Sequence, residues 1–339
     1  NLYYLSRASG DIYRISAVGL TGQDTVGLFA PTPSSFLLRN SLTPGAAEVS
    51  FSYGPPQSGW TPLAGDWDDN GSDTAGLYSP ASGRFFLRNS NSAGVADLNV
   101  QYGPAGQNWL PVVGDWNGDG RDTFGLFNPA SSVFFLRNSN SAGAADLVYG
   151  FGPADAGWLP IAGDWDGDGD DTVGLYNPVT STFFLRNQHA AGPADVQVQY
   201  GAPNSGARPL AGDWDANLTD TVGLYVPATG RFLLRNANAA GPADVNFVYG
   251  PGNQGWLPLV GDWDAVGGSS ANNEGAVALA APTQPPAHQS GASGVDAALA
   301  GWALHGLDSD ADDDSVMDAC GCSHRKRTQA EIELAFAEV

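Results

Sequence analysis

The sequence predicts an all-β fold made from one small sheet that is repeated along the chain, and three observations support it. Three short motifs recur at a constant spacing of 49 residues. Between them lie short runs of β-branched and aromatic residues, each bounded by Gly, Pro, Asn or Ser. Within the repeat, no run of about ten residues places its apolar side chains at helical spacing. Short runs of this composition are typical of strands.

The three motifs are Gly-Asp-Trp, Asp-Thr and Leu-Arg-Asn, and each keeps its spacing through five copies. The aspartate of Gly-Asp-Trp is found at Asp66, Asp115, Asp164, Asp213 and Asp262. The aspartate of Asp-Thr is found at Asp24, Asp73, Asp122, Asp171 and Asp220. The arginine of Leu-Arg-Asn is found at Arg39, Arg88, Arg137, Arg186 and Arg235. Three markers that keep one register indicate a true internal repeat.

One unit, residues 109–157, shows the order of elements inside the repeat. Four apolar runs lie at residues 109–114, 123–127, 133–137 and 146–149, and turns rich in Gly, Pro, Asn and Ser separate them. Four short antiparallel strands in a unit of this length are typical of one blade of a β-propeller. We therefore predict a β-propeller of four-stranded blades.

The number of blades follows from the number of units, and we expect about six. Five units are complete, and a sixth opens at Trp256 and continues through residues 275–281 but lacks its outer strands. Residues 2–5 resemble the third strand of a unit, so we expect the N-terminal segment to complete the last blade and close the ring. Residues 12–18 fit either the fourth strand of that blade or the first strand of the first blade. The propeller is thus expected over residues 1–282.

The composition limits the classes of partner that the chain can have. The 339 residues are 42% hydrophobic, which is enough for a large core. The net charge of −22, from 36 acidic and 14 basic residues, argues against binding to nucleic acid. No run of about 18 apolar residues occurs, so we expect no membrane span. Such an acidic surface is either solvated or holds cations.

The turn at residues 164–171 has the residue pattern of a calcium-binding loop. Oxygen-bearing side chains occupy its positions 1, 3, 5 and 8, which are Asp164, Asp166, Asp168 and Asp171. A glycine at position 6 permits a sharp reversal. A hard cation takes about six to eight oxygen ligands, and the backbone carbonyl of position 7 would be one of them. Because the carboxylates would repel each other without a cation, the pattern predicts a metal site.

Three other loops keep oxygen at all four positions, with Asn in place of Asp where a neutral oxygen suffices. They consist of Asp66, Asp68, Asn70 and Asp73; of Asp115, Asn117, Asp119 and Asp122; and of Asp213, Asp215, Asn217 and Asp220. The first unit has a shortened loop with Leu20 and Gln23, and the last unit has Val266 at position 5. We therefore predict four good sites and two degenerate ones.

Calcium is the ion that these loops predict. Every ligand is a protein oxygen in a flexible loop, which favours Ca²⁺ over Mg²⁺. The absence of His and Cys from the loops argues against zinc and copper. We expect the sites to be structural, because they link adjacent strands rather than line a pocket. The alternative is that these Asp- and Gly-rich turns are solvated hairpin turns.

The pattern Asp-x-Asp-Gly-Asp-Gly-x-Asp before a short strand, as in residues 164–171, resembles the repeats of FG-GAP and VCBS-type, integrin-like β-propellers. The likeness extends over residues 1 to about 282, although the Phe-Gly…Gly-Ala-Pro signature of that family is absent. The resemblance implies an extracellular or cell-surface protein with a role in adhesion, in glycan binding or in a surface structure.

Two other repeated residue types have a structural interpretation and a functional one. Tryptophans occupy position 2 of the loops or open the units, and we interpret both sets as packing residues rather than sugar-stacking platforms. They are Trp67, Trp116, Trp165, Trp214 and Trp263 in the loops, and Trp60, Trp109, Trp158 and Trp256 at the unit starts. We expect the Leu-Arg-Asn arginines to pair with acids of the fourth strand, namely Glu48, Asp97, Asp146, Asp195 and Asp244. The alternative is a basic ring that binds uronic-acid polysaccharides.

The C-terminal part has a different composition from the repeats. Residues 283–294 are rich in Pro, Ser, Gly and Ala and are expected to form a linker. Residues 295–339 form an acidic tail with two short segments that favour helix, at residues 295–304 and 328–339. The tail also holds the two cysteines of the chain, Cys320 and Cys322, to which we assign no role.

Together these features predict a secreted or cell-surface, calcium-stabilised β-propeller that is not an enzyme. Adhesion, or a place as a subunit in a surface or filament assembly, is the expected role, and an incomplete last blade would let a neighbouring chain supply a strand. A glycan-binding lectin is the alternative, and a polysaccharide-degrading enzyme is the second alternative. The expected partners are other protein chains, including copies of this one, or extracellular glycans. No nucleophile elbow or phosphate-binding loop supports catalysis.

Overall fold

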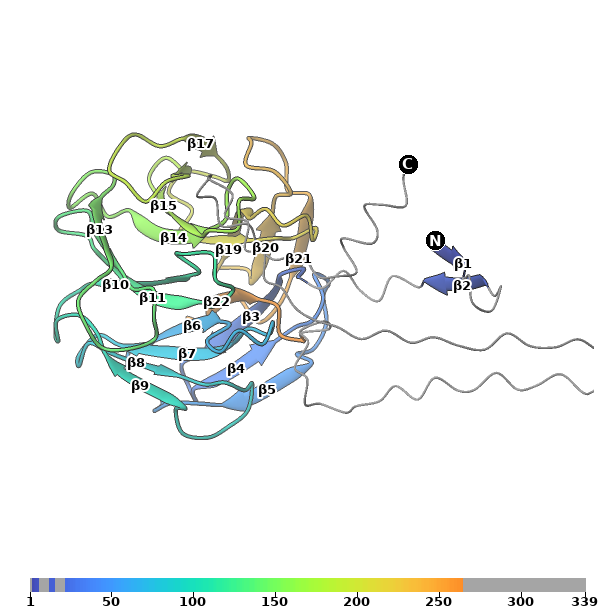
Figure 1. Cartoon of the computed structure of the whole chain (residues 1–339), viewed down its shortest axis with the longest axis horizontal. Helices are drawn as coiled ribbons and strands as arrows, with labels where there is room; N and C mark the ends of the chain where they lie inside the picture. The colour runs from blue at the N-terminus through green and yellow to red at the C-terminus, as the bar shows by residue number, and fades with distance from the viewer. Residues whose placement is uncertain (1, 6–11, 16–21, 265–339) are drawn as a thin grey trace, which may run out of the picture. The chain divides into compact units, whose positions relative to one another are not determined.

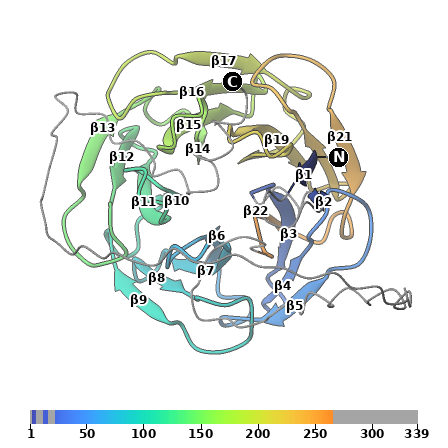
Figure 2. The same ribbon diagram turned by 45° about the vertical axis from the view of Figure 1, so that its right-hand side comes forward.

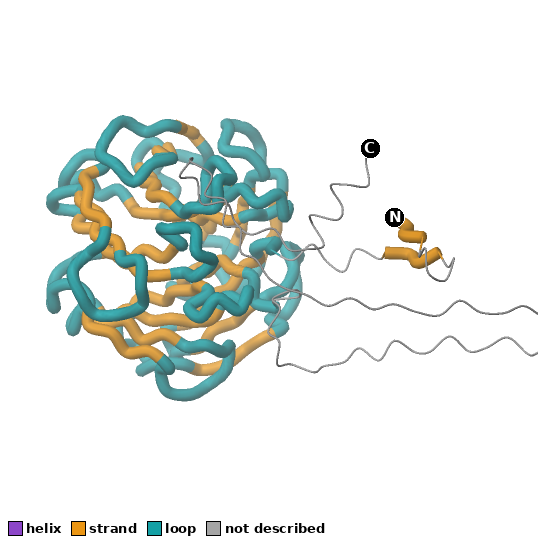
Figure 3. Tube along the Cα trace, viewed as in Figure 1, coloured by secondary structure: helices purple, strands orange, loops and turns teal. Residues whose placement is uncertain are grey.

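The structure of the chain is a computed structural model, and it describes residues 2–5, 12–15 and 22–264. Strands β1 (Leu2–Leu5) and β2 (Ile12–Ile15) form an antiparallel two-stranded sheet of their own, with Leu2 opposite Ile15. Residues 22–264 form five four-stranded antiparallel sheets. The described part of the chain contains strands and loops and no helix (Figure 3). The all-β prediction is therefore confirmed for these residues.

The five sheets are the blades of a β-propeller, arranged around a central axis (Figures 1 and 2). Blade 1 consists of β22 (Leu257–Gly261), β3 (Thr25–Ala30), β4 (Ser35–Leu38) and β5 (Val49–Ser52). Blade 2 consists of β6 (Thr61–Gly65), β7 (Thr74–Ser79), β8 (Arg84–Leu87) and β9 (Leu98–Gln101). Blade 3 consists of β10 (Leu110–Gly114), β11 (Thr123–Asn128), β12 (Val133–Leu136) and β13 (Leu147–Gly150). Blade 4 consists of β14 (Leu159–Gly163), β15 (Thr172–Asn177), β16 (Thr182–Leu185) and β17 (Val196–Gln199). Blade 5 consists of β18 (Arg208–Gly212), β19 (Thr221–Val226), β20 (Arg231–Leu234) and β21 (Val245–Val248).

The ring has five blades, so the expectation of about six is wrong. Strand β22 does not open a further blade, because it pairs with β3, with Leu257 opposite Phe29 and Gly261 opposite Thr25. The C-terminal end of the ring thus supplies the innermost strand of blade 1, and the N-terminal end supplies its other three strands. What the sequence presents as two degenerate units, at the start and the end of the repeats, is one blade made in two pieces.

The expected mode of closure is also wrong, because the N-terminal strands do not complete a blade. Strand β1 pairs with β2, and neither belongs to the five four-stranded sheets. Every blade has its four strands, so no place is left in the ring for a strand from a neighbouring chain. Residues 275–281, which we expected to continue a sixth blade, lie outside the described residues, as do the predicted linker 283–294 and tail 295–339.

The core lies between the blades and is formed by the second and third strands of each. Tyr78 and Phe85 of blade 2 are buried together with Phe124 of blade 3, and the rings of Phe85 and Phe124 stack at a centroid distance of 4.4 Å. The tryptophans at loop position 2 belong to this core and are 2–6% exposed. Their interpretation as packing residues is therefore confirmed. Burial of one large aromatic side chain contributes about 1.5–3 kcal/mol to folding.

The Leu-Arg-Asn arginines form the repeated ion pairs that the sequence predicts. In every blade the guanidinium contacts the acid at the start of the fourth strand, with N–O distances of 2.7–3.1 Å. These arginines are 4–9% exposed. Because they are buried and paired, they do not form a basic ring that is open to a polysaccharide.

In the part of the chain that the structure describes, no helix is long and apolar enough to cross a membrane.

Closure by β22 can be tested with two C-terminal truncations. A chain that ends at residue 256 lacks β22, so the backbone groups of β3 and the side chains around buried Leu259 become exposed. We expect its melting temperature to fall by at least about 10 °C in differential scanning calorimetry, as losses of several kcal/mol do. A chain that ends at residue 264 keeps all five blades and should melt like the full chain. Equal melting temperatures for the two truncations would contradict this account of closure.

Candidate metal centre

The four predicted loops join the first and second strands of blades 2 to 5, and each is folded around its position-1 aspartate. In blade 2, Oδ1 of Asp66 accepts a hydrogen bond from the backbone N–H of Asn70 at 3.1 Å, and Oδ2 accepts one from that of Gly71 at 2.6 Å. Asp115, Asp164 and Asp213 accept the corresponding bonds in their own loops. The loops are therefore compact turns in which the position-1 carboxylate organises the backbone.

In blade 4 the carboxylates of Asp164, Asp166 and Asp168 come together. Each offers an oxygen atom, and these atoms lie within 4.8 Å of one another. Among the described residues, this is the one group of three His, Cys, Asp or Glu side chains that meets this spacing. Asp166 and Asp168 are exposed, and Asp164 is half-buried. Burial raises the pKa of Asp166, and the charges of Asp168 and Asp164 raise that pKa further. A cation between the three would relieve this repulsion.

The other three loops bring together a carboxylate pair or a mixed set of Asp and Asn. Burial raises the pKa of Asp68, and the charge of Asp66 raises it further; Asp213 has the same effect on Asp215. The amide of Asn117 donates a hydrogen bond to the Asp119 carboxylate at 3.0 Å. These loops therefore offer fewer charges to a cation than the loop of blade 4.

The position-8 aspartates have a role that the sequence did not reveal, because their side chains bind the neighbouring blade. Oδ2 of Asp122 in blade 3 accepts a hydrogen bond from the backbone N–H of Asp66 in blade 2 at 2.8 Å. In return, the backbone N–H of Asp122 donates to the backbone oxygen of Asp66 at 2.9 Å. We call this pair of hydrogen bonds the inter-blade latch. Asp171 has this role in the next blade, and it is not part of the Asp164 group.

The inter-blade latch occurs at all five blade interfaces and closes the ring. The remaining four latches join Asp171 to Asp115, Asp220 to Asp164, Asp24 to Asp213 and Asp73 to Asp262. Their bonds are 2.7–3.0 Å long. The sequence did contain a signal for this role: the Asp-Thr aspartate is kept at Asp24, where the other ligand positions of the loop are missing.

The latch also accounts for the glycine of Gly-Asp-Trp. A Cβ on Gly65 would lie 3.0 Å from Oδ2 of Asp122 and 2.9 Å from Val113. The same contact recurs at the other four glycines of the motif, where a Cβ would lie 2.6–2.9 Å from Oδ2 of the latching aspartate. Glycine is required here because two blades approach closely.

The pKa of each of the five latching carboxyl groups is affected by burial and by at least one other latching aspartate. Burial raises the pKa of Asp122 and Asp220 to about 7. Burial also raises the pKa of Asp24, Asp73 and Asp171 well above the usual range, and the charges of adjacent latching aspartates add to this. The carboxyl group is therefore held as an acceptor of hydrogen bonds in surroundings that disfavour its charge.

The two degenerate units form one split loop in blade 1. Asp262 and Asp264 come from the end of β22, and Gly22 and Asp24 come from the start of β3. Burial and the neighbouring Asp264 raise the pKa of Asp262 to about 6, and a hydrogen bond from the backbone N–H of Gly22 opposes that rise. The split loop keeps the latch, and Val266 at its position 5 lies outside the described residues.

The tryptophans that open the units are half-buried packing residues. Trp60 stacks on Phe86 at a centroid distance of 4.5 Å, and Trp109 stacks on Phe135 at 4.8 Å. Trp158 makes the same contact with Phe184. Each of these indoles therefore has one face covered by a phenylalanine of its own blade.

Comparisons with known proteins give structural neighbours only. No protein-family model matches the sequence, and no curated protein matches it either. A lectin from Agrocybe aegerita that recognises non-reducing terminal N-acetylglucosamine is 14% identical, with a TM-score of 0.37 over 58% of this chain and 56% of that one. A Bacteroides caccae protein of unknown function is 12% identical, with a TM-score of 0.37 over 63% of this chain and 69% of that one. BBS1N, solved in complex with ARL6DN, is 8% identical, with a TM-score of 0.35 over 75% of this chain and 94% of that one. The match thus spans little more than half of the lectin.

The inter-blade latch can be tested by two substitutions at one position. Asp122→Ala removes the acceptor and leaves the backbone N–H of Asp66 without a partner, so we expect the free energy of unfolding to fall by about 1–3 kcal/mol. Asp122→Asn keeps an oxygen acceptor and carries no charge. Because burial raises the pKa of Asp122 and so disfavours a charge there, this variant should lose much less free energy of unfolding. Urea unfolding in EDTA measures both, with Asp119→Ala as a control in the same loop. Equal losses for the Ala and Asn variants would contradict the latch.

Proposed function

We propose that this chain is a calcium-stabilised β-propeller that acts outside the cell, in adhesion or as a building unit of a surface assembly. The observation that carries the proposal is the convergence of the Asp164, Asp166 and Asp168 carboxylates in a repeated turn. Oxygen ligands alone, in an exposed loop, suit Ca²⁺ among the common metal ions. The resemblance of the loop at residues 164–171 to FG-GAP and VCBS-type repeats also supports this proposal.

The exposure of the loops supports the extracellular part of the proposal. Asp166 and Asp168 are exposed, and so are Asn117, Asp119, Asp215 and Asn217 in blades 3 and 5, whereas Asp68 and Asn70 of blade 2 are half-buried. Ligands that are exposed to water bind a cation weakly, because water competes with them for the ion and screens their charge. Calcium modules outside cells work at about 10⁻⁴–10⁻³ M, where such weak sites fill. Inside a cell they would stay empty.

The outer strands support a role in assembly. Strands β5, β9, β13, β17 and β21 form the edges of the five blades. None of their residues is charged, although the chain as a whole has a net charge of −22. Natural edge strands are often protected from pairing by charged side chains. Edges without charge are suited to strand addition by another chain.

A second candidate function is glycan binding, and the repeated tryptophans favour it. Trp60, Trp109 and Trp158 are half-buried rather than buried, and each lies at the end of an exposed loop between two blades. The covered indole face rests on phenylalanine, so a sugar would have to contact the remaining exposed part of the ring. A glycan array probed with and without EDTA separates this candidate from adhesion through protein contacts.

The role that we propose is not catalytic. Sugar hydrolysis needs two carboxyl groups that face one cleft. The mouth of the central channel is lined by Leu, Pro, Thr and Arg side chains and has no carboxylate in its lining. The repeated aspartates of the described residues serve in turns, latches and ion pairs.

Removal of calcium tests the proposal. With calcium at about 100 times its dissociation constant, each filled site adds about 2.7 kcal/mol of stability, so EDTA should lower the melting temperature in scanning calorimetry. Asp166→Asn with Asp168→Asn should remove part of this shift, because the blade 4 loop loses two charged ligands. Asp170→Asn changes the same loop by one charge at position 7, where only the backbone carbonyl is expected to bind, and should leave the shift intact. An EDTA-treated chain that melts at the same temperature as the calcium-loaded chain would sink the proposal.

A further inference from the structure

The two ends of the ring carry opposite kinds of charge. The turns after the first and third strands of every blade lie at one end and hold nearly all the acidic residues of the ring. The loops and strand ends at the other end hold, within residues 22–264, three arginines and one acidic residue. They are Arg84, Arg208, Arg231 and Asp155. We call this second end the Arg208 face. An anion therefore meets far less repulsion at the Arg208 face than elsewhere on the ring.

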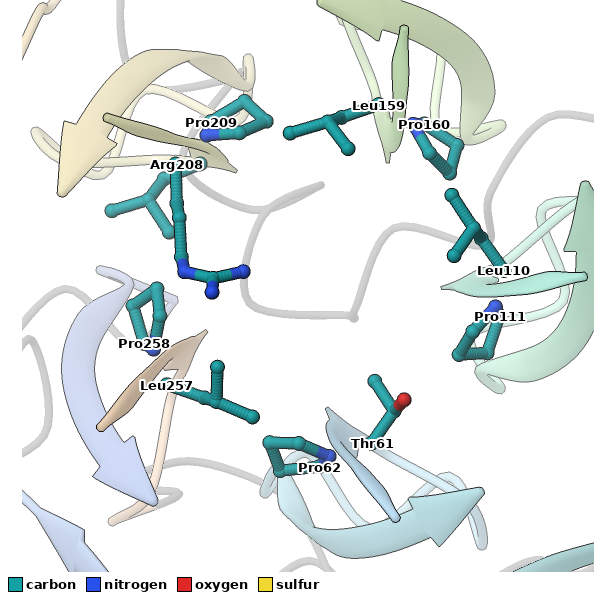
Figure 4. A pocket seen from close by; sticks show the side chains of 11 residues that line it. Thr61, Pro62, Leu110, Pro111, Leu159, Pro160, Arg208, Pro209, Leu257 and Pro258 are labelled. Carbon is teal, nitrogen blue, oxygen red and sulfur yellow. The ribbon is translucent and has the colours of Figure 1, made fainter. Parts of the chain in front are cut away.

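The central channel opens at the Arg208 face into a cavity of about 350 Å³. The first residues of the five inner strands form its wall, and each is followed by a proline. In four blades this first residue is Leu or Thr, namely Thr61, Leu110, Leu159 and Leu257. Figure 4 shows these side chains pointing inward around the opening. The cavity is at the lower end of the size range of small-molecule sites, which is about 300–1,000 Å³.

In blade 5 the first residue of the inner strand is Arg208, which places a guanidinium among the apolar side chains of the cavity wall. Its side chain extends from the start of β18 toward the middle of the cavity (Figure 4). Five arginines of the ring form the ion pairs with fourth-strand acids, and Arg208 is not one of them. Arg84 and Arg231 hydrogen-bond to side chains of the outer strands, whereas no such bond of Arg208 is seen within the described residues. Arg208 thus presents its five donors to the cavity.

We infer that the mouth of the central channel binds a small monocarboxylate with an apolar body. The guanidinium of Arg208 matches a carboxylate in a planar, two-bond geometry. The leucines and prolines of the cavity wall would contact the apolar body of the ligand and remove it from water. No aromatic side chain lines the cavity, and Thr61 is its one uncharged polar side chain, so the lining is poorly suited to a sugar.

This site is separate from the calcium loops. Each inner strand begins at the cavity and ends next to a latch. In β18 the four residue steps from Arg208 to Gly212 span about 13 Å, and this length separates the cavity from the latch. The ligand would therefore bind without contact to the acidic loops. Binding of the carboxylate should not require calcium as a ligand, so this inference can fail or succeed independently of the proposed function.

Octanoate is a suitable probe, because it joins a carboxylate to an apolar chain. We expect isothermal titration calorimetry on the full chain in calcium to show saturable binding of octanoate. Glucuronate, which has the carboxylate without the apolar body, should bind at least about tenfold more weakly. Octan-1-ol, which has the apolar body without the charge, should also bind at least about tenfold more weakly.

Substitution at Arg208 tests the assigned residue. Arg208→Leu gives blade 5 the side chain that three other blades have at this place, so the variant should fold and melt like the original chain. It should reduce octanoate affinity at least about tenfold. Arg231→Leu removes a charge from the same face outside the cavity and should leave the affinity unchanged. Arg208→Lys keeps the charge without the planar fork and should have an intermediate affinity.

Three results would overturn the inference. They are the absence of octanoate binding, equal affinities for octanoate and glucuronate, and binding that survives Arg208→Leu in a folded variant. If Arg208→Leu does not fold, the Arg208→Lys variant decides, because an unchanged affinity there shows that the guanidinium is not recognised through its fork. A saturation-transfer NMR experiment on octanoate adds a second measure of contact with the ligand chain.

Discussion

The propeller depends on a reciprocal pair of hydrogen bonds between neighbouring blades, the inter-blade latch. Asp122 illustrates it: the backbone N–H donates to Asp66 of the preceding blade, and the carboxyl accepts the N–H of that same residue. Since the pair recurs at all five interfaces, the blades are fixed to each other at the same height and spacing. The aromatic core between blades adds most of the burial, and the latch joins the backbones of neighbouring blades at one end of that core.

A single motif of three residues therefore meets three requirements of this ring. In Gly65-Asp66-Trp67, the glycine allows the latching carboxyl of the next blade to approach, and the tryptophan is buried in the core between strands. The aspartate receives the latch through its backbone and folds the turn through its side chain. This turn also carries positions 3 and 5, the half-buried Asp68 and Asn70, where a cation would bind. Stability of the ring and presentation of the proposed calcium loops are thus coupled through one residue.

Much of the fold could be read from the sequence, because the repeat makes each strand and turn appear several times in one register. The four strands per blade and the pairing of Arg137 with Asp146 followed from local composition and spacing. The number of blades did not, since a strand at residues 257–261 has the same local sequence whether it opens a new blade or completes the first. The role of position 8 was missed for a similar reason: Asp171 is close to its own loop in sequence, and its partner belongs to another unit.

The most direct measurement of this account is native-state hydrogen exchange at the backbone amides of Asp66, Asp115, Asp164 and Asp213. These residues begin loops, where amides ordinarily exchange quickly through local opening. If the latch holds the ring together, their amides should exchange as slowly as those of the buried second strands, only through global unfolding, and should do so in EDTA as well as in calcium. Exchange at the rate of the neighbouring loop amides would contradict the claim that the blades are joined at these residues.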